Sequence, residues 1–421
     1  MLDIKFIREN KELIAAGSAK KHINFNVDEL ITVDDTRRTI LAEVEAMRAQ
    51  QNETAAKVAQ AQDQTEREAM ITQSRVVKES LQKKEEELGE VMKKWHGLMV
   101  QVPNIPDMSV PEGADDAGNV EVRTWGEIPK FDFAPKDQVA LLQMHDMVDF
   151  ERGTKVAGFR GYYLKNDAVL LNVALWQFVF AKLVAKGFTP IMVPSLVRRE
   201  PLVGTGFLPQ SEEDLYKTQD GDFLAGTGEV STMGYYMDEV LKKEDFPKKF
   251  IAFSPCFRRE AGSHGKDTKG LVRVHEFFKL EQVILCEASH EESVKYHEEL
   301  TAISEEIMQD LKIPYHVVLN CGGDLGLGQV KKYDIEAWVP SEGKYRETHS
   351  ASYFHDFQTR RLNIRYKDTD GKLRFAHSLN NTALASPRIL VPLIENYQNA
   401  DGSITVPEAL RPFMGGREKI G

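Results

Sequence analysis

A long stretch without proline, residues 35–102, constrains the fold of this chain more than any other feature. Apolar side chains recur there at alternating steps of three and four residues, a heptad spacing that is typical of helices packed along a seam. The first series of seam positions holds Ile40, Val44, Met47, Gln51, Thr54 and Val58, and the second holds Met70, Val77, Leu81, Leu88, Val91, Trp95, Leu98 and Val102. The spacing predicts two long helices.

Polar residues 62–66 separate the two series, and we expect the chain to reverse there. Each of the two antiparallel helices would then be about 45 Å long, at about 1.5 Å per residue. Asp34 or Asp35 is the expected N-cap of the first helix. A hairpin of that length cannot fold back onto one globular core, so we expect it to project as an arm. A coiled coil that pairs two copies of the chain would show the same spacing.

The length of 421 residues, with 42% hydrophobic and 28% charged, is typical of a soluble protein with more than one domain. No apolar run approaches the roughly 20 residues of a membrane span, so we expect no membrane association. The N-terminus lacks the apolar core and cleavage site of a secretory signal. These features predict a cytoplasmic protein.

The formal net charge of −11 argues against a protein that coats nucleic acid unselectively, but it allows local basic patches that bind one folded RNA. The three cysteines, Cys256, Cys286 and Cys321, are widely spaced and odd in number. They match neither a disulfide framework nor a zinc pattern. We therefore expect buried, reduced thiols and no zinc.

The chain divides into three parts. Residues 1–102 hold the arm, preceded by a short amphipathic helix over residues 2–17. Residues 103–119 form an acidic linker with several prolines and glycines, and residues 120–421 form the remaining domain. In that domain, residues 167–186 predict a largely buried helix with Leu170 and Val173 on its most apolar side, and residues 187–197 predict a strand.

Residues 253–283 predict a β-hairpin with a polar loop. An apolar run at 253–257 is followed by a loop rich in Gly, Ser, Asp and Lys at 260–270, and the strand pattern resumes at Leu271. One face of this hairpin would carry cations, an aromatic ring and carboxylates together. Phosphate binds fixed cations, preferably arginine where contact is bidentate. A solvated outer face of a sheet is the alternative interpretation.

The hairpin sequence FRREAGSHGKDTKGLVRVHEFFKLE, residues 257–281, resembles motif 2 of the class II aminoacyl-tRNA synthetases, and of the seryl-tRNA synthetases in particular. Residues 167–197 are similar to motif 1, and HSLNNTALASPRILVPLIENYQ, from His377, is similar to motif 3. The resemblance implies an α+β fold, with a long N-terminal antiparallel coiled-coil arm followed by a catalytic domain built on an antiparallel β-sheet flanked by helices. Motif 1 forms a homodimer interface in this class.

The resemblance implies roles in ATP binding for residues of the hairpin. Arg258 corresponds to the arginine that bridges the α-phosphate and the amino-acid carboxylate. Glu260 corresponds to a partner of the adenine side of ATP, and Phe277 to the ring that stacks on adenine, with Val274 beside the base. Glu276 stands where glutamine is usual.

Two later segments complete the implied ATP site. Glu347 and Ser350 correspond to the residues that hold Mg²⁺ at the ATP phosphates, and hard oxygen ligands suit that ion. Arg388, near the start of a predicted helix, corresponds to the arginine at the γ-phosphate. Arg258, Glu347 and Arg388 are thus the implied catalytic residues. Tyr353 replaces the usual asparagine.

The resemblance also implies a serine pocket. Thr227 and Glu229, in a segment that predicts a strand, correspond to the Thr-x-Glu serine-binding segment, with Gly228 where alanine is more common. The further pocket residues implied by the resemblance are Arg258, Glu281, Asn380 and Thr382.

The activity that the resemblance implies is that of a serine–tRNA ligase. ATP and L-serine would give seryl-adenylate and pyrophosphate, and tRNA(Ser), bound through the arm, would receive the seryl group; selenocysteine tRNA stays open as a second acceptor. Arg258, Arg388 and Mg²⁺ would stabilise charge without a general base. A catalytically inactive, synthetase-like RNA-binding or regulatory protein is the alternative.

Overall fold

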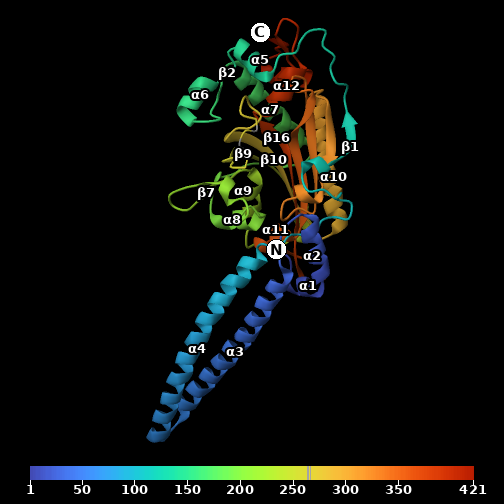
Figure 1. Cartoon of the computed structure of the whole chain (residues 1–421). Helices are drawn as coiled ribbons and strands as arrows, with labels where there is room; N and C mark the ends of the chain where they lie inside the picture. The colour runs from blue at the N-terminus through green and yellow to red at the C-terminus, as the bar shows by residue number, and fades with distance from the viewer. Residues whose placement is uncertain (263–264, 266) are drawn as a thin grey trace. The chain divides into compact units, whose positions relative to one another are not determined.

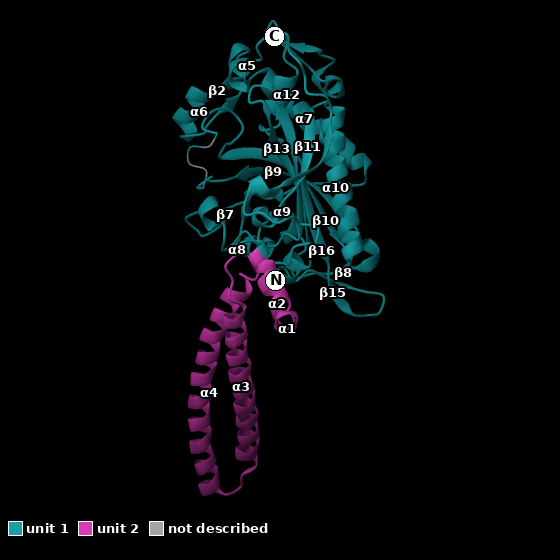
Figure 2. Ribbon diagram, turned by 45° about the vertical axis from the view of Figure 1, so that its right-hand side comes forward, with its two compact units in different colours: residues 1, 20–22, 104–421 teal, residues 2–19, 23–103 magenta. Residues whose placement is uncertain are grey.

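The computed structural model describes residues 1–262, 265 and 267–421, so Ser263, His264 and Lys266 of the predicted hairpin loop lie outside the described residues. The chain forms two compact units, one of residues 2–19 and 23–103 and the other of residues 1, 20–22 and 104–421 (Figure 2). The first is helical, and the second contains all the β-strands described below.

Two long helices, α3 (Val27–Gln60) and α4 (Gln64–Met99), run antiparallel and side by side (Figure 1). The reversal between them falls where the polar stretch predicted it, with Asp63 capping α4. Ile40, Val44 and Leu81 are buried between the helices, with Met47, Leu88 and Val91 packed against them. The predicted heptad seam is therefore confirmed at these positions.

The start of the first long helix was predicted wrongly. Asn26, and not Asp34 or Asp35, caps α3, because the Asn26 side chain accepts from the backbone N–H of Glu29 at 3.1 Å. Asp34 lies within the helix, where it is buried and forms ion pairs with Arg8 and Arg37. The preceding segment is also two helices, α1 (Ile4–Glu9) and α2 (Lys11–Lys20), and not one.

The second unit is built on an eight-stranded sheet in which all neighbours are antiparallel except β4 and β9, which are parallel. Its strands, in spatial order, are β1 (Val120–Trp125), β11 (Tyr315–Leu319), β12 (Lys331–Val339), β13 (Lys344–His355), β16 (His377–Ser386), β10 (Glu276–Cys286), β9 (Lys248–Phe257) and β4 (Thr189–Met192).

Smaller sheets surround the large one. They consist of β2 (Val148–Asp149) with β3 (Tyr163–Leu164); β5 (Leu196–Val197), β7 (Phe223–Leu224) and β6 (Tyr216–Lys217); β15 (Leu373–Phe375), β14 (Arg365–Lys367) and β8 (Val240–Lys242); and β17 (Ile404–Thr405) with β18 (Lys419–Ile420).

The second unit also contains helices that lie on the two faces of the large sheet or beside it. They are α5 (Gln138–Met144), α6 (Phe150–Ala157), α7 (Asp167–Ala185), α8 (Arg199–Thr205), α9 (Gly228–Gly234), α10 (His290–Asp310), α11 (Phe357–Arg361) and α12 (Leu390–Asn396). Short 3₁₀ helices lie at Asp116–Gly118, Glu212–Asp214, Lys243–Asp245, Gly322–Asp324 and Glu408–Met414.

The main hydrophobic core lies on one face of this sheet. There α7 and α10 contribute Leu171, Leu175 and Leu300, which pack with Leu280 and Ile335 of the strands. The opposite face carries α8, α9 and α11, and α9 contacts both β9 and β10. Side chains alternate between the two faces along each strand, so every second residue is turned toward α9 and its neighbours. All three cysteines are buried and unpaired, as predicted.

Helix α7 corrects two expectations. With 19 residues and a mean hydropathy of 1.8, it is long and apolar enough to cross a membrane by length and composition, although no such run was expected. Leu171 and Leu175 are fully buried in the core, as in the core helix of a globular domain. Leu170 and Val173, however, are 50% and 36% exposed, so the helix is not largely buried on that side.

Candidate active site

The predicted hairpin is formed by β9 and β10. The antiparallel register pairs Cys256 with Phe277 and Ala252 with Glu281. The returning strand begins at Glu276 and not at Leu271, and residues 267–275 form a loop. The alternation along β10 places Phe277, Lys279 and Glu281 on one face, so the ring, the ammonium group and the carboxylate do share a face as predicted.

Arg258 follows the last residue of β9 and lies over Phe277. Its guanidinium carbon is 5.3 Å from the centre of that ring, and its Nε donates to the carbonyl oxygen of Gly226 at 3.2 Å. A Cβ at position 226 would lie 3.3 Å from the carbonyl oxygen of Phe257 and 3.4 Å from Arg258 Cγ, so this segment passes close to Arg258. The guanidinium is thereby fixed between the aromatic ring and the segment that carries Thr227.

Ion pairs hold the loop between the two strands. Arg273 donates to the Glu260 carboxylate at 2.5 Å and lies 3.6 Å from Asp267, which also pairs with Arg346 of β13. Burial raises the pKa of Asp267, but Arg346 and Arg273 outweigh burial and hold it below its ordinary value. Val274 is buried within this loop. The loop is therefore fastened to both the hairpin and β13.

Arg388 follows β16 and reaches the same region. Its Nε donates to the carbonyl oxygen of Val272 at 2.9 Å, and its Nη1 donates to the carbonyl oxygen of Glu347 at 3.3 Å. Burial lowers the pKa of Arg388, Glu347 opposes this, and the positive charges of Arg258 and Arg273 lower it further. Arginine stays charged nonetheless. Several cations thus converge where an anion such as phosphate would be stabilised.

A β-bulge brings Glu347 and Ser350 to one face of β13. Their spacing of three residues would otherwise put them on opposite faces, but the register shifts so that Glu347 faces Glu336 while Ser350 faces Asp334. Burial raises the pKa of Asp334, Lys332 opposes the rise, and nearby Glu347 adds to it.

Glu347 and Ser350 supply oxygen atoms of the kind that Mg²⁺ prefers, because a carboxylate and a hydroxyl are hard ligands. The neighbouring Asp334 carboxylate is already paired with Lys332 at 3.3 Å, and Glu347 lies 3.8 Å from Arg388. Within the described ranges, no group of three or more His, Cys, Asp or Glu side chains is arranged to hold a metal ion. Magnesium bound at Glu347 and Ser350 would therefore take its other ligands from phosphate and water, as this ion commonly does.

The segment of Thr227 and Glu229 is helical and not the predicted strand. Thr227 is the N-cap of α9, and its hydroxyl accepts from the backbone N–H of Glu229 at 3.4 Å. This capping bond satisfies a backbone donor that would otherwise be unpaired, which favours a helix start at this position. The helix begins on the sheet face that carries Glu281 and turns Glu229 into the interior.

A buried lysine connects Thr227 to Glu281. Lys279 Nζ donates to Thr227 Oγ1 at 2.6 Å and forms an ion pair with the Glu281 carboxylate. Thr227 Oγ1 also donates to Glu281 at 3.4 Å. Lys279 and Glu281 are 6% and 2% exposed, so this ion pair is shielded from water and its geometry is fixed.

Glu229 is a second buried carboxylate in this group. Its Oε1 accepts from Gln358 Nε2 at 2.6 Å. Burial raises the pKa of Glu229 to about 7, with Glu281 adding to the rise and Gln358, Lys279 and Asn380 opposing it. Glu229 therefore titrates near neutral pH.

Strand β16 completes the polar pocket. Thr382 lies opposite Glu281, and Asn380 lies opposite Val283, in the antiparallel ladder with β10. Both side chains are buried. The predicted pocket residues Thr227, Glu229, Glu281, Asn380 and Thr382 are thus brought together in space, and Arg258 joins them to the cationic side of the site.

The three departures from the family pattern lie in different surroundings. A Cβ at Gly228 would lie 3.1 Å from the buried Ser254 Oγ, so alanine there would require the Ser254 side chain to shift slightly. Glu276 is exposed and its carbonyl accepts from Tyr162. Tyr353 is fully buried on the core face and donates to Asp107 at 2.9 Å. Tyr353 therefore does not line the serine pocket.

Sequence reasoning did not name Asp334 or Gln358 as residues of the site. Lys279 was expected among the cations of the hairpin face, where strand alternation places it between Phe277 and Glu281, but its contact with Thr227 was not predicted. Asp334 becomes a neighbour of Ser350 only through the bulged register of β13. Gln358 meets Glu229 only in the folded chain, and no local pattern indicates that contact.

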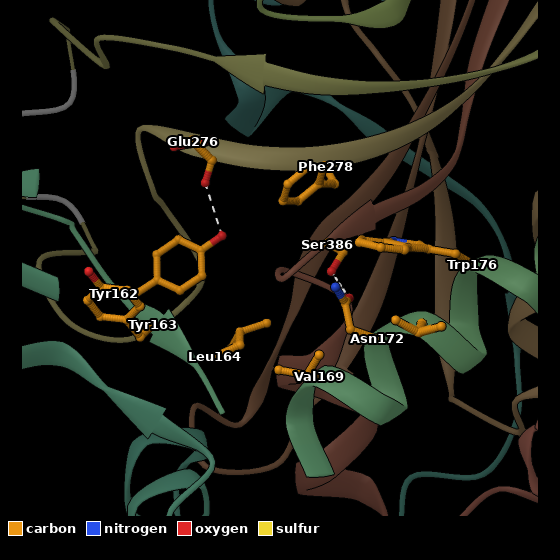
Figure 3. Close-up of a pocket in the computed structure, with 10 residues that line it drawn as sticks. Tyr162, Tyr163, Leu164, Val169, Asn172, Trp176, Glu276, Phe278 and Ser386 are labelled. Atoms are coloured by element: carbon orange, nitrogen blue, oxygen red, sulfur yellow. Dashed lines mark hydrogen bonds between the residues drawn. The ribbon is translucent and has the colours of Figure 1, made fainter. Parts of the chain in front are cut away.

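A cavity of about 330 Å³ lies on the opposite face of β10 (Figure 3). Its lining residues are Tyr162, Tyr163, Leu164, Val169, Asn172, Val173, Trp176, Glu276, Phe278 and Ser386. Because Glu276 and Phe278 alternate with Phe277, this cavity faces away from the polar pocket. It contains none of the predicted site residues.

Comparison with known proteins agrees with both units of the fold. Residues 1–106 match the family described as the seryl-tRNA synthetase N-terminal domain, and residues 216–397 match the tRNA synthetase class II core domain (G, H, P, S and T). The chain is 47% identical over 422 residues to the serine–tRNA ligase of Deinococcus radiodurans, covering 100% of this chain and 99% of that one.

Solved structures are similar over the full length. The seryl-tRNA synthetase of Pyrococcus horikoshii complexed with ATP has a TM-score of 0.90 at 39% identity, covering 100% of this chain and 99% of that chain. The cytoplasmic serine–tRNA ligase of Naegleria fowleri in complex with AMP has a TM-score of 0.86 at 31% identity, covering 100% and 98%. The chain therefore belongs to the seryl-tRNA synthetase family of class II aminoacyl-tRNA synthetases.

Proposed function

We propose that this chain is a serine–tRNA ligase, which activates L-serine with ATP and transfers the seryl group to tRNA(Ser). The observation that carries this proposal is the junction at Arg258. On one side of it lie Phe277 and the cation Arg388, which suit a nucleotide, and on the other lies a buried pocket with Glu229 and Glu281, which suits a small ammonium-bearing substrate.

The residues act by positioning and by charge. Phe277 stacks on adenine, with Val274 beside the base and Glu260 on the adenine side. Arg258 binds the α-phosphate and the serine carboxylate together, and Arg388 binds the γ-phosphate. As the serine carboxylate attacks phosphorus and pyrophosphate leaves, the fixed guanidinium groups stabilise the developing negative charge. Holding both reactants in line removes much of the entropic cost of their meeting.

Serine selectivity follows from a small polar pocket. Glu229 and Glu281 accept from the serine ammonium and hydroxyl groups, with Thr227, Asn380 and Thr382 around them. Alanine would leave these buried groups unpaired, and threonine would have to fit an extra methyl group.

Glu347 and Ser350 would hold Mg²⁺, with Asp334 beside them. The bound ion would neutralise charge on the ATP phosphates. Glu347 in turn accepts from Arg388 through its backbone carbonyl, so the two groups around the phosphates are held at a fixed separation.

The helical arm binds tRNA(Ser), a role supported by the match of residues 1–106 to the family's N-terminal domain. Residues 1–102 form the tRNA-binding domain with its arm, residues 103–119 a linker, and residues 120–421 the catalytic domain. The chain acts in the cytoplasm as a homodimer, without membrane association. The exposed apolar side of α7 supports the dimer, since large apolar patches commonly mark protein interfaces.

Exchange of labelled pyrophosphate into ATP tests the proposal. The purified chain should catalyse exchange with L-serine far faster than with L-threonine or L-alanine, and should then charge tRNA(Ser). Absence of serine-dependent exchange would refute adenylate formation and favour the inactive RNA-binding alternative.

A further inference from the structure

We propose that Gln358 is a positioning residue that holds the Glu229 carboxylate toward the serine pocket, and that Ser378 holds Gln358 in turn. This inference rests on the proposed function, because it concerns how the serine pocket of that enzyme is organised. It adds two residues that do not touch serine to those that determine serine binding.

The contacts form a continuous chain from β16 to α9. Ser378 Oγ donates to Gln358 Oε1 at 2.7 Å, and Gln358 Nε2 donates to Glu229 Oε1 at 2.6 Å. Gln358 Nε2 also donates to the carbonyl oxygen of Thr205 at 3.3 Å. Every member is buried: Ser378 is 0%, Gln358 1%, Thr205 4% and Glu229 6% exposed.

The partners select one orientation of the Gln358 amide. The ionised Glu229 carboxylate and the Thr205 carbonyl can only accept, so both require the NH₂ side of the amide. The Ser378 hydroxyl donates to the other side. Reversing the amide would set its oxygen against two acceptors in a buried site, and such unpaired buried polar groups are costly.

Several elements meet at this amide. Gln358 lies on α11, Thr205 is the last residue of α8, Ser378 is on β16 and Glu229 is in the first turn of α9. Helix α8 packs against both α9 and α11 (Figure 1). The position of Glu229 is therefore set by the surrounding fold and not by its own short helix alone.

Glu229 needs such a support because of the charges around it. The charged groups that face it are the Glu281 carboxylate and the Lys279 ammonium, with Asn380 also in contact. Lys279 forms an ion pair with Glu281, so among the described residues Glu229 has no ammonium partner of its own. The Gln358 amide stabilises the Glu229 carboxylate in place until the serine ammonium arrives.

The first test replaces Gln358 by methionine, which has a similar volume but cannot donate. We expect the Kd for L-serine, measured by calorimetry without ATP, to rise about tenfold, equivalent to about 1.4 kcal/mol. The Kd for ATP should change less than twofold, because the hydrogen bonds of Gln358 lead to the serine side. Binding of L-serine by Gln358→Met within twofold of the parent chain would overturn the proposal.

Gln398→Met is the matched control. Gln398 is also buried, at 5% exposed, and it likewise makes three hydrogen bonds, to the backbone N–H and carbonyl of Lys136 and the carbonyl of Glu395. Its loss should leave the Kd for L-serine unchanged within twofold. A shift equal to that of Gln358→Met would mean that loss of any buried glutamine weakens serine binding, and would also overturn the proposal.

The Gln358→Glu variant separates positioning from space filling. At about pH 6 the new carboxyl group and Glu229 would share one proton, as close carboxyl pairs do, so an O–H would replace the amide donor. We expect this variant to bind L-serine at least threefold more tightly than Gln358→Met at that pH. If Gln358 only filled space, the apolar methionine would be the better replacement, and that order would contradict the proposal.

Ser378→Ala gives a test that keeps Gln358 in place. We expect the Kd for L-serine to rise about threefold, while kcat for exchange at saturating serine stays unchanged. If Gln358→Met does not fold, this variant tests the positioning role in its place. No change in Kd there would refute the role of Ser378. Failure of the proposed function has a different signature, since the unmodified chain itself would then bind no serine.

Discussion

In the proposed serine pocket, the Glu229 and Glu281 carboxylates lie with one buried ammonium among the described residues, that of Lys279. Burying a polar group without a hydrogen-bond partner costs on the order of 2–7 kcal/mol, and burying an unpaired charge costs more. A second cation in the pocket would therefore be bound favourably. Serine brings that cation as its ammonium group. The serine ammonium group would therefore balance the second carboxylate charge of the pocket. The protonation state of Glu229 would then control the affinity for serine.

Serine affinity should rise with pH through about 7. The folded chain raises the pKa of Glu229 from 4.5 to about 7, so between these values folded Glu229 keeps a proton that the unfolded chain has released. Its contribution to the free energy of unfolding therefore falls as pH rises through that window. Serine requires the ionised form, so its Kd should fall by up to about tenfold per pH unit below the pKa. Calorimetry across about pH 5.5 to 8 measures this slope.

Glu229→Gln supplies the control for that slope. The amide does not titrate, so we expect weaker serine binding that is nearly independent of pH over the same range. If both proteins showed the same slope, the titrating group would lie elsewhere. A pH-independent Kd in the unmodified chain would contradict the raised pKa of Glu229.

Arg388→Ala should slow serine-dependent pyrophosphate exchange by about 10²–10³-fold, the usual effect of removing one fixed charge-stabilising group. Its Kd for serine should change little, because its hydrogen bonds lead to Val272 and Glu347 on the phosphate side. Arg258→Ala should lose as much rate and also bind serine more weakly. Arg374→Ala, an exposed arginine paired with Asp368 and Asp370, should retain normal exchange.

The elements differ in how far the sequence alone predicted them. The heptad spacing sufficed for α3 and α4, because each seam contact lies within the two helices that the pattern defines. Strand alternation placed Phe277 and Glu281 on one face. Helix α9 was mistaken for a strand, since its start depends on the Thr227 cap, which the pattern of small residues does not reveal. The bulge in β13 and the Gln358 contact depend on pairing between distant segments, which a local pattern does not contain.

Removing the arm should separate the two steps of the reaction. A chain joined across roughly residues 35–100, which deletes most of α3 and α4, should charge tRNA(Ser) far more slowly, because the proposed RNA contacts are lost. Pyrophosphate exchange should stay within about threefold, since the predicted site residues all lie in the other compact unit. Both assays on the same preparations give the comparison. Equal loss of charging and exchange would contradict the assigned role of the arm.

On the scale of the whole molecule, the unpaired apolar surface calls for an explanation. Val169, Leu170, Val173 and Val184 of α7 are 36–50% exposed, and Met192 of the edge strand β4 is 79% exposed. Val169 and Val173 are one helical turn apart, and Val184 lies about three turns further on. An apolar helix side next to an open strand edge is a typical site of association with another chain.

A charge on this surface should therefore break the proposed homodimer. Leu170→Glu would place a carboxylate in the apolar contact, where the cost of its desolvation is far larger than that of the lost packing. We therefore expect light scattering at micromolar concentration to show a monomer for this variant and a dimer for the unmodified chain. Leu373→Glu is the matched control, because Leu373 is 51% exposed against 50% for Leu170 but lies on β15, away from α7. The control should stay dimeric. If the unmodified chain were itself a monomer, the α7 surface would need another partner; if Leu170→Glu stayed dimeric, the two copies would meet through a different face.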